Sequence, residues 1–219
     1  MLTYEQIVKN PDINTYIESA DRALFTLGYT EHSFAHVTKV AKNVEYILKT
    51  LNKDDHSIEL AKIAAHLHDI GNVINRIEHS QSGAVMAFRL LDNLNMDATD
   101  IATVITAIGN HDEGTGVPVD DVSAALILAD KCDVRRSRVR NRDKSTFDIH
   151  DRVNYSVERS SLKINNAKTE ICLELTIDTE YSSIMEYFEI FLERMLLCRK
   201  AAEKLNLSFK LIINHQALL

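Results

Sequence analysis

The sequence predicts a mainly α-helical protein with a small α+β part at its C-terminus. Apolar residues recur at helical spacing through residues 1–155, and beyond residue 156 they alternate with a period of two in two short stretches. The chain has 219 residues and 45% hydrophobic content, enough for one sizeable core or for a core with a small second unit. We therefore expect a helical domain over residues 1–155 and a ββαβ unit over residues 156–219.

Six amphipathic helices are expected in the N-terminal part. The first begins at Pro11 and ends before Gly28, and the second carries His36 on its apolar stripe. The third ends in the stretch "HLHDIGN", where we expect Gly71 to terminate the helix. The six helices are expected at residues 11–27, 31–51, 57–70, 82–94, 99–109 and 122–138.

The C-terminal part shows the pattern of strands. "SLKI" and "ICLELTI" flank the turn-rich "NNAKTE", and in the second run every other residue is apolar, which is typical of a β-hairpin with one buried face. A long amphipathic helix is expected over residues 179–205, followed by a strand in "FKLIIN". The resulting ββαβ unit is either a small subdomain or a sheet packed on the helices.

Charge and cysteine content narrow the class of protein. The net charge of −7 argues against a protein that coats nucleic acid non-specifically, because such binding needs an excess of Lys and Arg. The three cysteines are widely spaced and odd in number, which favours a reducing compartment. With neither a secretory leader pattern nor a membrane-spanning apolar run, we expect a cytoplasmic protein.

The adjacent residues His68 and Asp69 are the first candidates for a functional site. They end an apolar helix, and a buried carboxylate needs either a polar partner or a metal ion. Asp130 raises the same question in the apolar run "AALILADKCD". A single buried histidine such as His36 is more often a hydrogen-bonded core residue, and Asp130 has a candidate partner in Lys131. Together with the His68–Asp69 pair, however, these residues favour a metal site.

Five stretches occur in the order and rough spacing of a known family. "HVTKVA", "HLHDIG", "HSQSGA", "IGNHDEG" and "LILADKCD" give the series H…HD…H…H…D, and over residues 20–140 the sequence resembles the HD-domain metal-dependent phosphohydrolase superfamily. The resemblance implies an HD-domain helical bundle with one or two divalent metal ions. It implies that Asp69 bridges the two ions and is central to catalysis. The implied metal ligands are His36, His68, Asp69, His79, His111 and Asp130.

The sequence departs from some branches of that superfamily. Asn72 stands where a lysine often follows the "HDIG" motif, and His111 is followed by Asp112 instead of a second histidine. The "GYP" signature and the acidic pair of alarmone hydrolases have no counterpart after the HD pair. These departures disfavour cyclic-dinucleotide and alarmone substrates. The spacing is closest to small bacterial HD proteins that act on nucleotides or dinucleoside polyphosphates.

The implied chemistry is attack of a metal-bound hydroxide on a phosphate ester or anhydride of a nucleotide-like substrate. Imidazole and carboxylate ligands suit Fe, Mn, Ni, Co or Zn, and such ions activate water without a Ser or Cys nucleophile. Cations near the site are expected to face the phosphoryl oxygens. The expected substrate-binding residues are Asn72, Arg76, Lys131 and Arg135. His32 and Asp112 are expected to lie behind the ligands or to contact the substrate.

Two other functions remain open. The same ligands fit a di-iron oxygenase, which would consume oxygen. A non-catalytic, metal-stabilised module could instead bind RNA through the basic run "RRSRVRNRDK" at residues 135–144, although nucleic acid is not the favoured partner. A homo-oligomer is compatible with the sequence and a membrane partner is not expected. The second His-Asp dipeptide, in "IHD" at residues 149–151, follows no apolar helix and is interpreted as coincidental.

Overall fold

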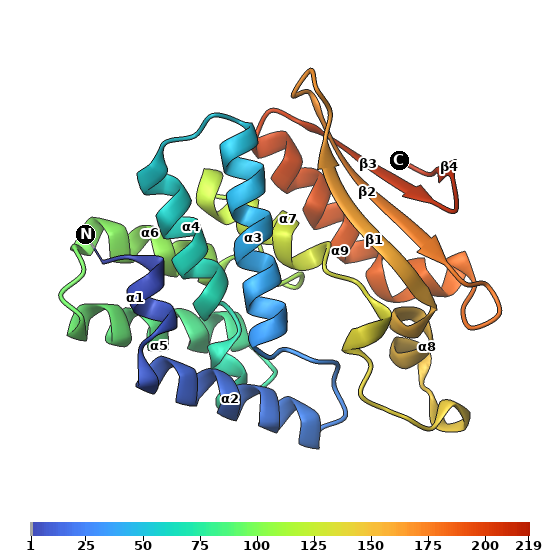
Figure 1. The fold of residues 1–219 in the computed structure, drawn as a ribbon, viewed down its shortest axis with the longest axis horizontal. Helices are drawn as coiled ribbons and strands as arrows, with labels where there is room; N and C mark the ends of the chain where they lie inside the picture. Colours follow the sequence, from blue (N-terminus) through green and yellow to red (C-terminus); the bar gives the residue numbers. More distant parts are fainter. Residues whose placement is uncertain (1) are drawn as a thin grey trace.

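The computed structural model describes residues 2–219 and confirms the predicted fold class, with most of the chain helical and a small sheet near its C-terminus (Figure 1). The α-helices are α1 (Tyr4–Val8), α2 (Pro11–Thr26), α3 (Phe34–Thr50), α4 (Asp55–Leu67), α5 (His79–Asn93), α6 (Ala98–Gly109), α7 (Asp121–Lys131), α8 (Ile149–Ser156) and α9 (Ile184–Lys204). Short 3₁₀ turns lie at Ile70–Val73, Arg136–Arg138 and Lys144–Thr146.

Side-chain caps set where the helices begin. The Asn10 side chain accepts hydrogen bonds from the first turn of α2, with Pro11 at the first helical position. Ser33 caps α3, so this helix starts at Phe34 and not at Glu31. Helix α5 begins at His79, three residues before the expected start at residue 82. The position of His79 in the first turn of α5 matters for the site described below.

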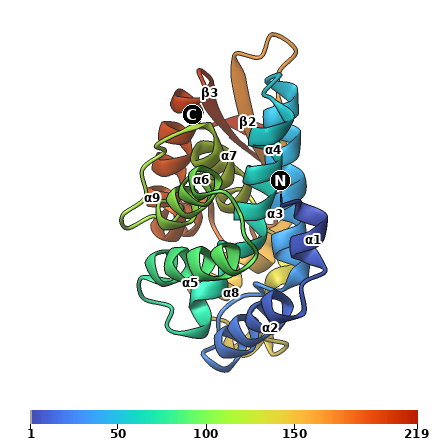
Figure 2. The same cartoon turned by 90° about the vertical axis from the view of Figure 1, so that its left-hand side faces the viewer.

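Helices α3, α4 and α7 form the centre of the molecule. Helix α3 packs against α4 and α7, helix α5 packs against α6, and α2 lies across the 3₁₀ turn Ile70–Val73 (Figures 1 and 2). In α7, every residue from Val122 to Lys131 is buried. The C-terminal ends of α4 and α7, where two of the predicted ligand segments lie, are therefore enclosed by other helices.

The sheet has the strand order β1-β2-β3-β4, formed by Val157–Ile164, Glu170–Ile177, Ser208–Ile213 and Gln216–Ala217. Strands β1 and β2 form the expected antiparallel hairpin, and β3 pairs parallel to β2 after the crossover through α9. In β2 the alternate residues Ile171, Leu173, Leu175 and Ile177 are buried. Helix α9 packs against both the sheet and α7. The division into residues 1–155 and 156–219 stays a prediction.

Three local expectations were wrong. Helix α7 ends at Lys131 and not at Arg138, because the following residues turn into an irregular segment around the buried Asp133. Farther along the chain, residues Ile149–Ser156 form α8, a separate helix for which the sequence pattern gave no expectation. Gly71 does not end α4, which stops at Leu67. It lies inside the next turn, where an added Cβ would be 2.0 Å from the carbonyl oxygen of His79.

Within residues 2–219, the helices are too short or too polar to cross a lipid bilayer.

Candidate metal centre

The six predicted ligands converge on one place, although they come from five separate segments of the chain. His36 lies on α3, His68 and Asp69 follow the end of α4, and His79 is the first residue of α5. His111 follows α6, and Asp130 is next to last in α7. The exposed fraction of each of the six residues is 8% or less.

Four of these side chains form a first group. The Nε2 atom of His36 lies 3.3 Å from Nε2 of His68, 3.2 Å from Oδ1 of Asp130 and 3.6 Å from Oδ2 of Asp69. The same Asp69 oxygen lies 3.1 Å from Nε2 of His68. Two ligands at about 2.1 Å from a tetrahedral ion are about 3.4 Å apart. The spacing of the first group therefore matches the space between ligands of one metal ion.

A second group lies on the other side of Asp69. Oδ1 of Asp69 is 3.4 Å from Nε2 of His79 and 4.0 Å from Nε2 of His111. The two histidine Nε2 atoms are 3.2 Å apart. Asp69 thus presents one carboxylate oxygen to each group, which is the arrangement that a carboxylate bridging two ions requires.

The hydrogen bonds of the four rings fix which nitrogen faces inward. In each ring Nδ1 is bonded to an oxygen that accepts a hydrogen, so the neutral ring carries its proton on Nδ1 and leaves a lone pair on Nε2. The Nδ1 acceptors are Asp133 Oδ2 for His36 at 2.8 Å, the Ala65 carbonyl for His68 at 2.8 Å, the Arg76 carbonyl for His79 at 3.1 Å and the Ile108 carbonyl for His111 at 2.6 Å. All four rings are prepared to donate a lone pair to a cation.

The electrostatics of the site also favour a positive charge. Burial opposes protonation of His68, but the carboxylates of Asp69 and Asp130 outweigh it and raise its pKa to about 10. Burial likewise opposes ionisation of Asp130, yet Lys131 and the histidines beside it hold the pKa of this carboxyl well below its usual range. Two buried carboxylates therefore remain charged where the imidazoles meet. The donor set fits a divalent metal ion.

Asn72 supports the site through hydrogen bonds to Asp69. Its Nδ2 donates hydrogen bonds to the backbone carbonyl of Asp69 at 2.9 Å and to Oδ1 of Asp69 at 3.0 Å. The side chain is buried and does not line the cavity. The structure thus places Asn72 where it orients the Asp69 carboxylate, and not in the expected position facing a substrate.

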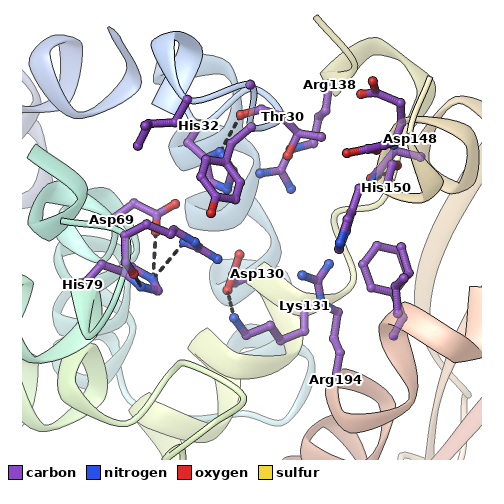
Figure 3. A pocket seen from close by; sticks show the side chains of 18 of the residues that line it. Thr30, His32, Asp69, His79, Asp130, Lys131, Arg138, Asp148, His150 and Arg194 are labelled. Atoms are coloured by element: carbon purple, nitrogen blue, oxygen red, sulfur yellow. Dashed lines mark hydrogen bonds and ion pairs between the residues drawn. The ribbon is translucent and has the colours of Figure 1, made fainter. Parts of the chain in front are cut away.

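A cavity of about 400 Å³ opens beside the metal cluster (Figure 3). Of the predicted substrate-binding residues, Arg76 and Lys131 line it. Nη1 of Arg76 lies 3.3 Å from Nε2 of His79, and Nζ of Lys131 lies 2.9 Å from Oδ2 of Asp130. Burial opposes the charge of Lys131, but Asp130 and Glu113 raise its pKa, so it stays a cation.

Arg135 is not brought to this cavity. Its guanidinium forms ion pairs with Glu31 at 3.3 Å and with Asp133 at 3.0 Å, and it faces a different part of the surface. The expected substrate contact of Arg135 is therefore not supported. The reason is the early end of α7, which leaves Arg135 in the irregular segment after the helix.

His32 and Asp112 lie close to the cluster of predicted ligands. The His32 ring is 5.5 Å from the His36 ring and lines the cavity, and its Nδ1 bonds to the Thr30 carbonyl. Burial holds the pKa of His32 well below its usual range. One carboxylate oxygen of Asp112 lies 3.8 Å from Nζ of Lys131, so Asp112 acts on the cavity through that lysine.

Several residues of the site were missed by the sequence analysis. Arg194 was not predicted; it comes from α9, pairs with Glu113 at 2.7 Å and adds a cation to the cavity. Arg138, which belongs to the basic run at residues 135–144, adds another. Asp133 accepts a hydrogen bond from His36, and the only sequence feature that could have indicated this role is its position three residues after Asp130 in "DKCD". His150 and Asp151 of "IHD" also line the cavity. Helix α8 carries this dipeptide, which the sequence analysis interprets as coincidental, to the cavity beside the predicted ligands.

The basic run at residues 135–144 is largely neutralised within the chain. In the described structure, four of its arginines form ion pairs with carboxylates: Arg135 with Glu31 and Asp133, Arg136 with Glu158 and Asp178, Arg138 with Asp133, and Arg140 with Asp21. Arg138 is also buried. A run whose charges are paired internally offers little attraction to a phosphate backbone.

The chain is similar to known proteins over much of its length. The HD domain family matches residues 33–135, which include all six predicted ligands. The uncharacterized protein MJ1020 of Methanocaldococcus jannaschii is 28% identical over 218 residues, covering 89% of this chain and 83% of its own. The crystal structure of a predicted HD superfamily hydrolase from an uncultured Thermotogales bacterium is 27% identical. That match covers 57% of this chain and 67% of the other, with a TM-score of 0.45.

The family match and the geometry agree. An HD domain with a buried cluster of histidines and aspartates supports a metal-dependent hydrolase. The order H…HD…H…H…D, first noted as a resemblance, lies within the matched residues. Residues 33–135 match the HD domain family, and this part of the chain forms an HD domain.

Proposed function

We propose that the protein is a metal-dependent phosphohydrolase that cleaves a phosphate ester or anhydride of a small nucleotide-like substrate. The observation that carries the proposal is the position of Asp69, whose two carboxylate oxygens each face a separate group of imidazole Nε2 atoms. In this proposal His36, His68, Asp69 and Asp130 hold one divalent transition metal ion. Asp69, His79 and His111 hold a second.

Divalent ions bound there supply an activated water and neutralise charge on the phosphoryl oxygens. The chain itself supplies further positive charge around the cavity. Arg76 and Lys131 lie beside the two ligand groups, and Arg194 lies farther along the same cavity (Figure 3). Fixed cations in a partly enclosed site stabilise the charge that develops during phosphoryl transfer. This cationic lining favours a phosphorylated substrate over a neutral one.

The roles of the supporting residues follow from their contacts. Asn72 holds the Asp69 carboxylate by a hydrogen bond to Oδ1, and Asp133 holds His36 by accepting from its Nδ1. Both side chains are buried and keep the ligands in one orientation. Lys131 is positioned by Asp130 and Glu113, which leaves its charge next to a ligand carboxylate.

Metal analysis and a substrate panel test the proposal. Protein purified without chelator is expected to contain Fe, Mn, Ni, Co or Zn and to release phosphate from phosphate esters or anhydrides. Asp69→Asn removes the charge shared by both groups, so metal content and phosphate release should fall to background. Asp92→Asn, on the exposed part of α5, is the matched control and should behave as the wild type.

Two outcomes would overturn the proposal. One is folded, metal-loaded protein that releases no phosphate from any member of a broad panel of monoesters, diesters and anhydrides. The other is iron-loaded protein that consumes oxygen with a substrate, which would establish the di-iron oxygenase.

A further inference from the structure

The cavity beside the metal cluster has a second wall formed by α8 and α9. This wall lies outside the residues that match the HD domain, and it includes Asp148, His150 and Arg194. Figure 3 shows Asp69 and His79 on one side of the cavity and His150 on the other, with the His150 ring directed into the cavity. The cavity is therefore open between the predicted ligands and His150.

The His150 ring has no bonding partner among residues 2–219, and its side chain is exposed to the cavity. Each neighbouring carboxylate has one oxygen engaged in a hydrogen bond of its own. Oδ1 of Asp148 accepts from the backbone N–H of Asp151, and Oδ2 of Asp151 accepts from Asn141. His150 thus stands in the first turn of α8 with both ring nitrogens available to a ligand.

Other titratable groups in the cavity are poorly suited to give up a proton. Lys131 is held as a cation by Asp130 and Glu113, and the three arginines keep their charge. The Nδ1 atom of His32 is bonded to the Thr30 carbonyl, and burial keeps this ring neutral. The remaining histidines are directed at the metal cluster.

We propose that His150 is a catalytic general acid that protonates the leaving oxygen of the substrate. The inference rests on the proposed phosphohydrolase function and specifies its substrate class. In an in-line displacement the leaving group departs opposite the attacking water. Because the metal ligands occupy one side of the cavity, the leaving oxygen departs toward the side where His150 lies.

The oxygen of the attacking water forms a bond to phosphorus while the bond from phosphorus to the leaving oxygen breaks. The leaving oxygen keeps the electron pair of the broken bond and takes a proton from the His150 imidazolium. The attacking water loses its proton to solvent, and His150 regains a proton from solvent, so the reaction consumes one water and releases an alcohol and phosphate.

This role selects a class of substrate. An alkoxide is a poor leaving group and needs a proton, whereas the phosphate released from an anhydride departs as a stable anion. Asp148 and Asp151 on the same helix add negative charge that disfavours a second phosphate there. The substrate is therefore a phosphomonoester of an alcohol, such as a nucleoside monophosphate, and not an anhydride or dinucleoside polyphosphate.

Two substrates with different leaving groups test this inference. p-Nitrophenyl phosphate releases a phenolate that needs no proton, and a nucleoside 5′-monophosphate releases an alkoxide that does. His150→Gln should lower kcat by about 100-fold or more on the nucleotide and by less than about threefold on p-nitrophenyl phosphate. Metal content and the thermal midpoint should stay at the wild-type values, because His150 is exposed.

His215→Asn is the matched control. His215 is exposed in the turn before β4 with a φ of 67°, a conformation that asparagine tolerates. Equal loss on both substrates, no loss on either, or selective loss from His32→Gln in place of His150→Gln would overturn the inference and leave the phosphohydrolase proposal intact. Wild-type protein that hydrolyses neither substrate nor any other phosphate compound would overturn both.

Discussion

The cavity lies between two walls that are fixed in different ways. We call the side with the six predicted ligands the metal wall, and the side formed by α8 and α9 the second wall. On the metal side, three of the four histidines donate Nδ1–H to the backbone carbonyl of the residue three positions earlier, as His68 does to Ala65. On the side of α8 and α9, Arg194 is held by the side chain of Glu113, and the His150 ring is not bonded by the described residues. Local backbone thus orients the ligands, whereas tertiary packing places the residues that face them.

This difference separates two tasks within one site. Rings held by their own helix turns keep their lone pairs directed at a metal whether or not a substrate is present. Side chains held by long-range ion pairs, or by none, are set by the way α8 and α9 pack on the HD domain. We infer that the metal wall determines the chemistry and that the second wall determines which leaving group is accepted.

Among the residues that support the two walls without being predicted ligands or acids, the largest effect is expected from the residue that orients His36. His36 is oriented by a side chain, because its Nδ1 donates to Asp133 Oδ2 at 2.8 Å. Asp133→Asn should weaken metal binding by about 10- to 100-fold, the usual effect of losing such a support. Titration of the chelator-treated variant with Zn²⁺ or Mn²⁺ measures this.

The control for Asp133→Asn must account for its other partners. Asp133 also pairs with Arg135 and Arg138, so the variant is expected to be less stable as well. Arg135→Gln removes one of these pairs but leaves the bond to His36 in place. Metal binding that weakens equally in both variants would show that Asp133 acts through local stability and not through His36.

The contrast between the walls also explains which parts of the site are predictable from sequence. All six expected ligands converge, because each is tied to a short motif at a helix end and the motifs occur in a fixed order. The ββαβ pattern is equally visible, since β2 alternates apolar and polar residues through its length. Local periodicity and local motifs suffice for these features.

The second wall has no comparable signal. In an amphipathic helix such as α9, a charged residue like Arg194 is indistinguishable from one on a solvated face. Asn72 was assigned to the substrate because it stands where a lysine often follows the HDIG motif, and Arg135 because it closely follows the ligand Asp130. Neighbours in sequence diverge, however, once a helix ends. Asn72 turns inward to Asp69, and Arg135 turns to Glu31.

A smaller effect is expected from Arg194, the cation of the second wall. Its guanidinium lines the cavity and stays charged, because burial is outweighed by Glu113 and Asp130. Arg194→Gln should raise KM for a phosphate ester about tenfold, since a hydrogen bond to a charged group contributes about 1.5–3 kcal/mol. Steady-state kinetics at constant metal loading check this. Arg199→Gln, exposed on the same helix, should leave KM unchanged, and loss of metal from the Arg194 variant would contradict the separation of the two walls.

The smallest effect is expected from Arg135, which lies close to the ligand Asp130 in sequence and yet belongs to neither wall. It is partly exposed, and its pair with Glu31 lies near the surface, where such pairs contribute about 0–1 kcal/mol. The buried Asp133 keeps His36 and Arg138 as partners when Arg135 is replaced. Arg135→Gln should therefore lower the free energy of unfolding by less than about 1 kcal/mol. KM should stay at the wild-type value, because no part of Arg135 lines the cavity. Chemical denaturation and steady-state kinetics measure the two quantities on one preparation. A rise in KM as large as that of Arg194→Gln would place Arg135 in contact with the substrate after all, and the substrate would then extend beyond the two walls toward the segment that follows α7.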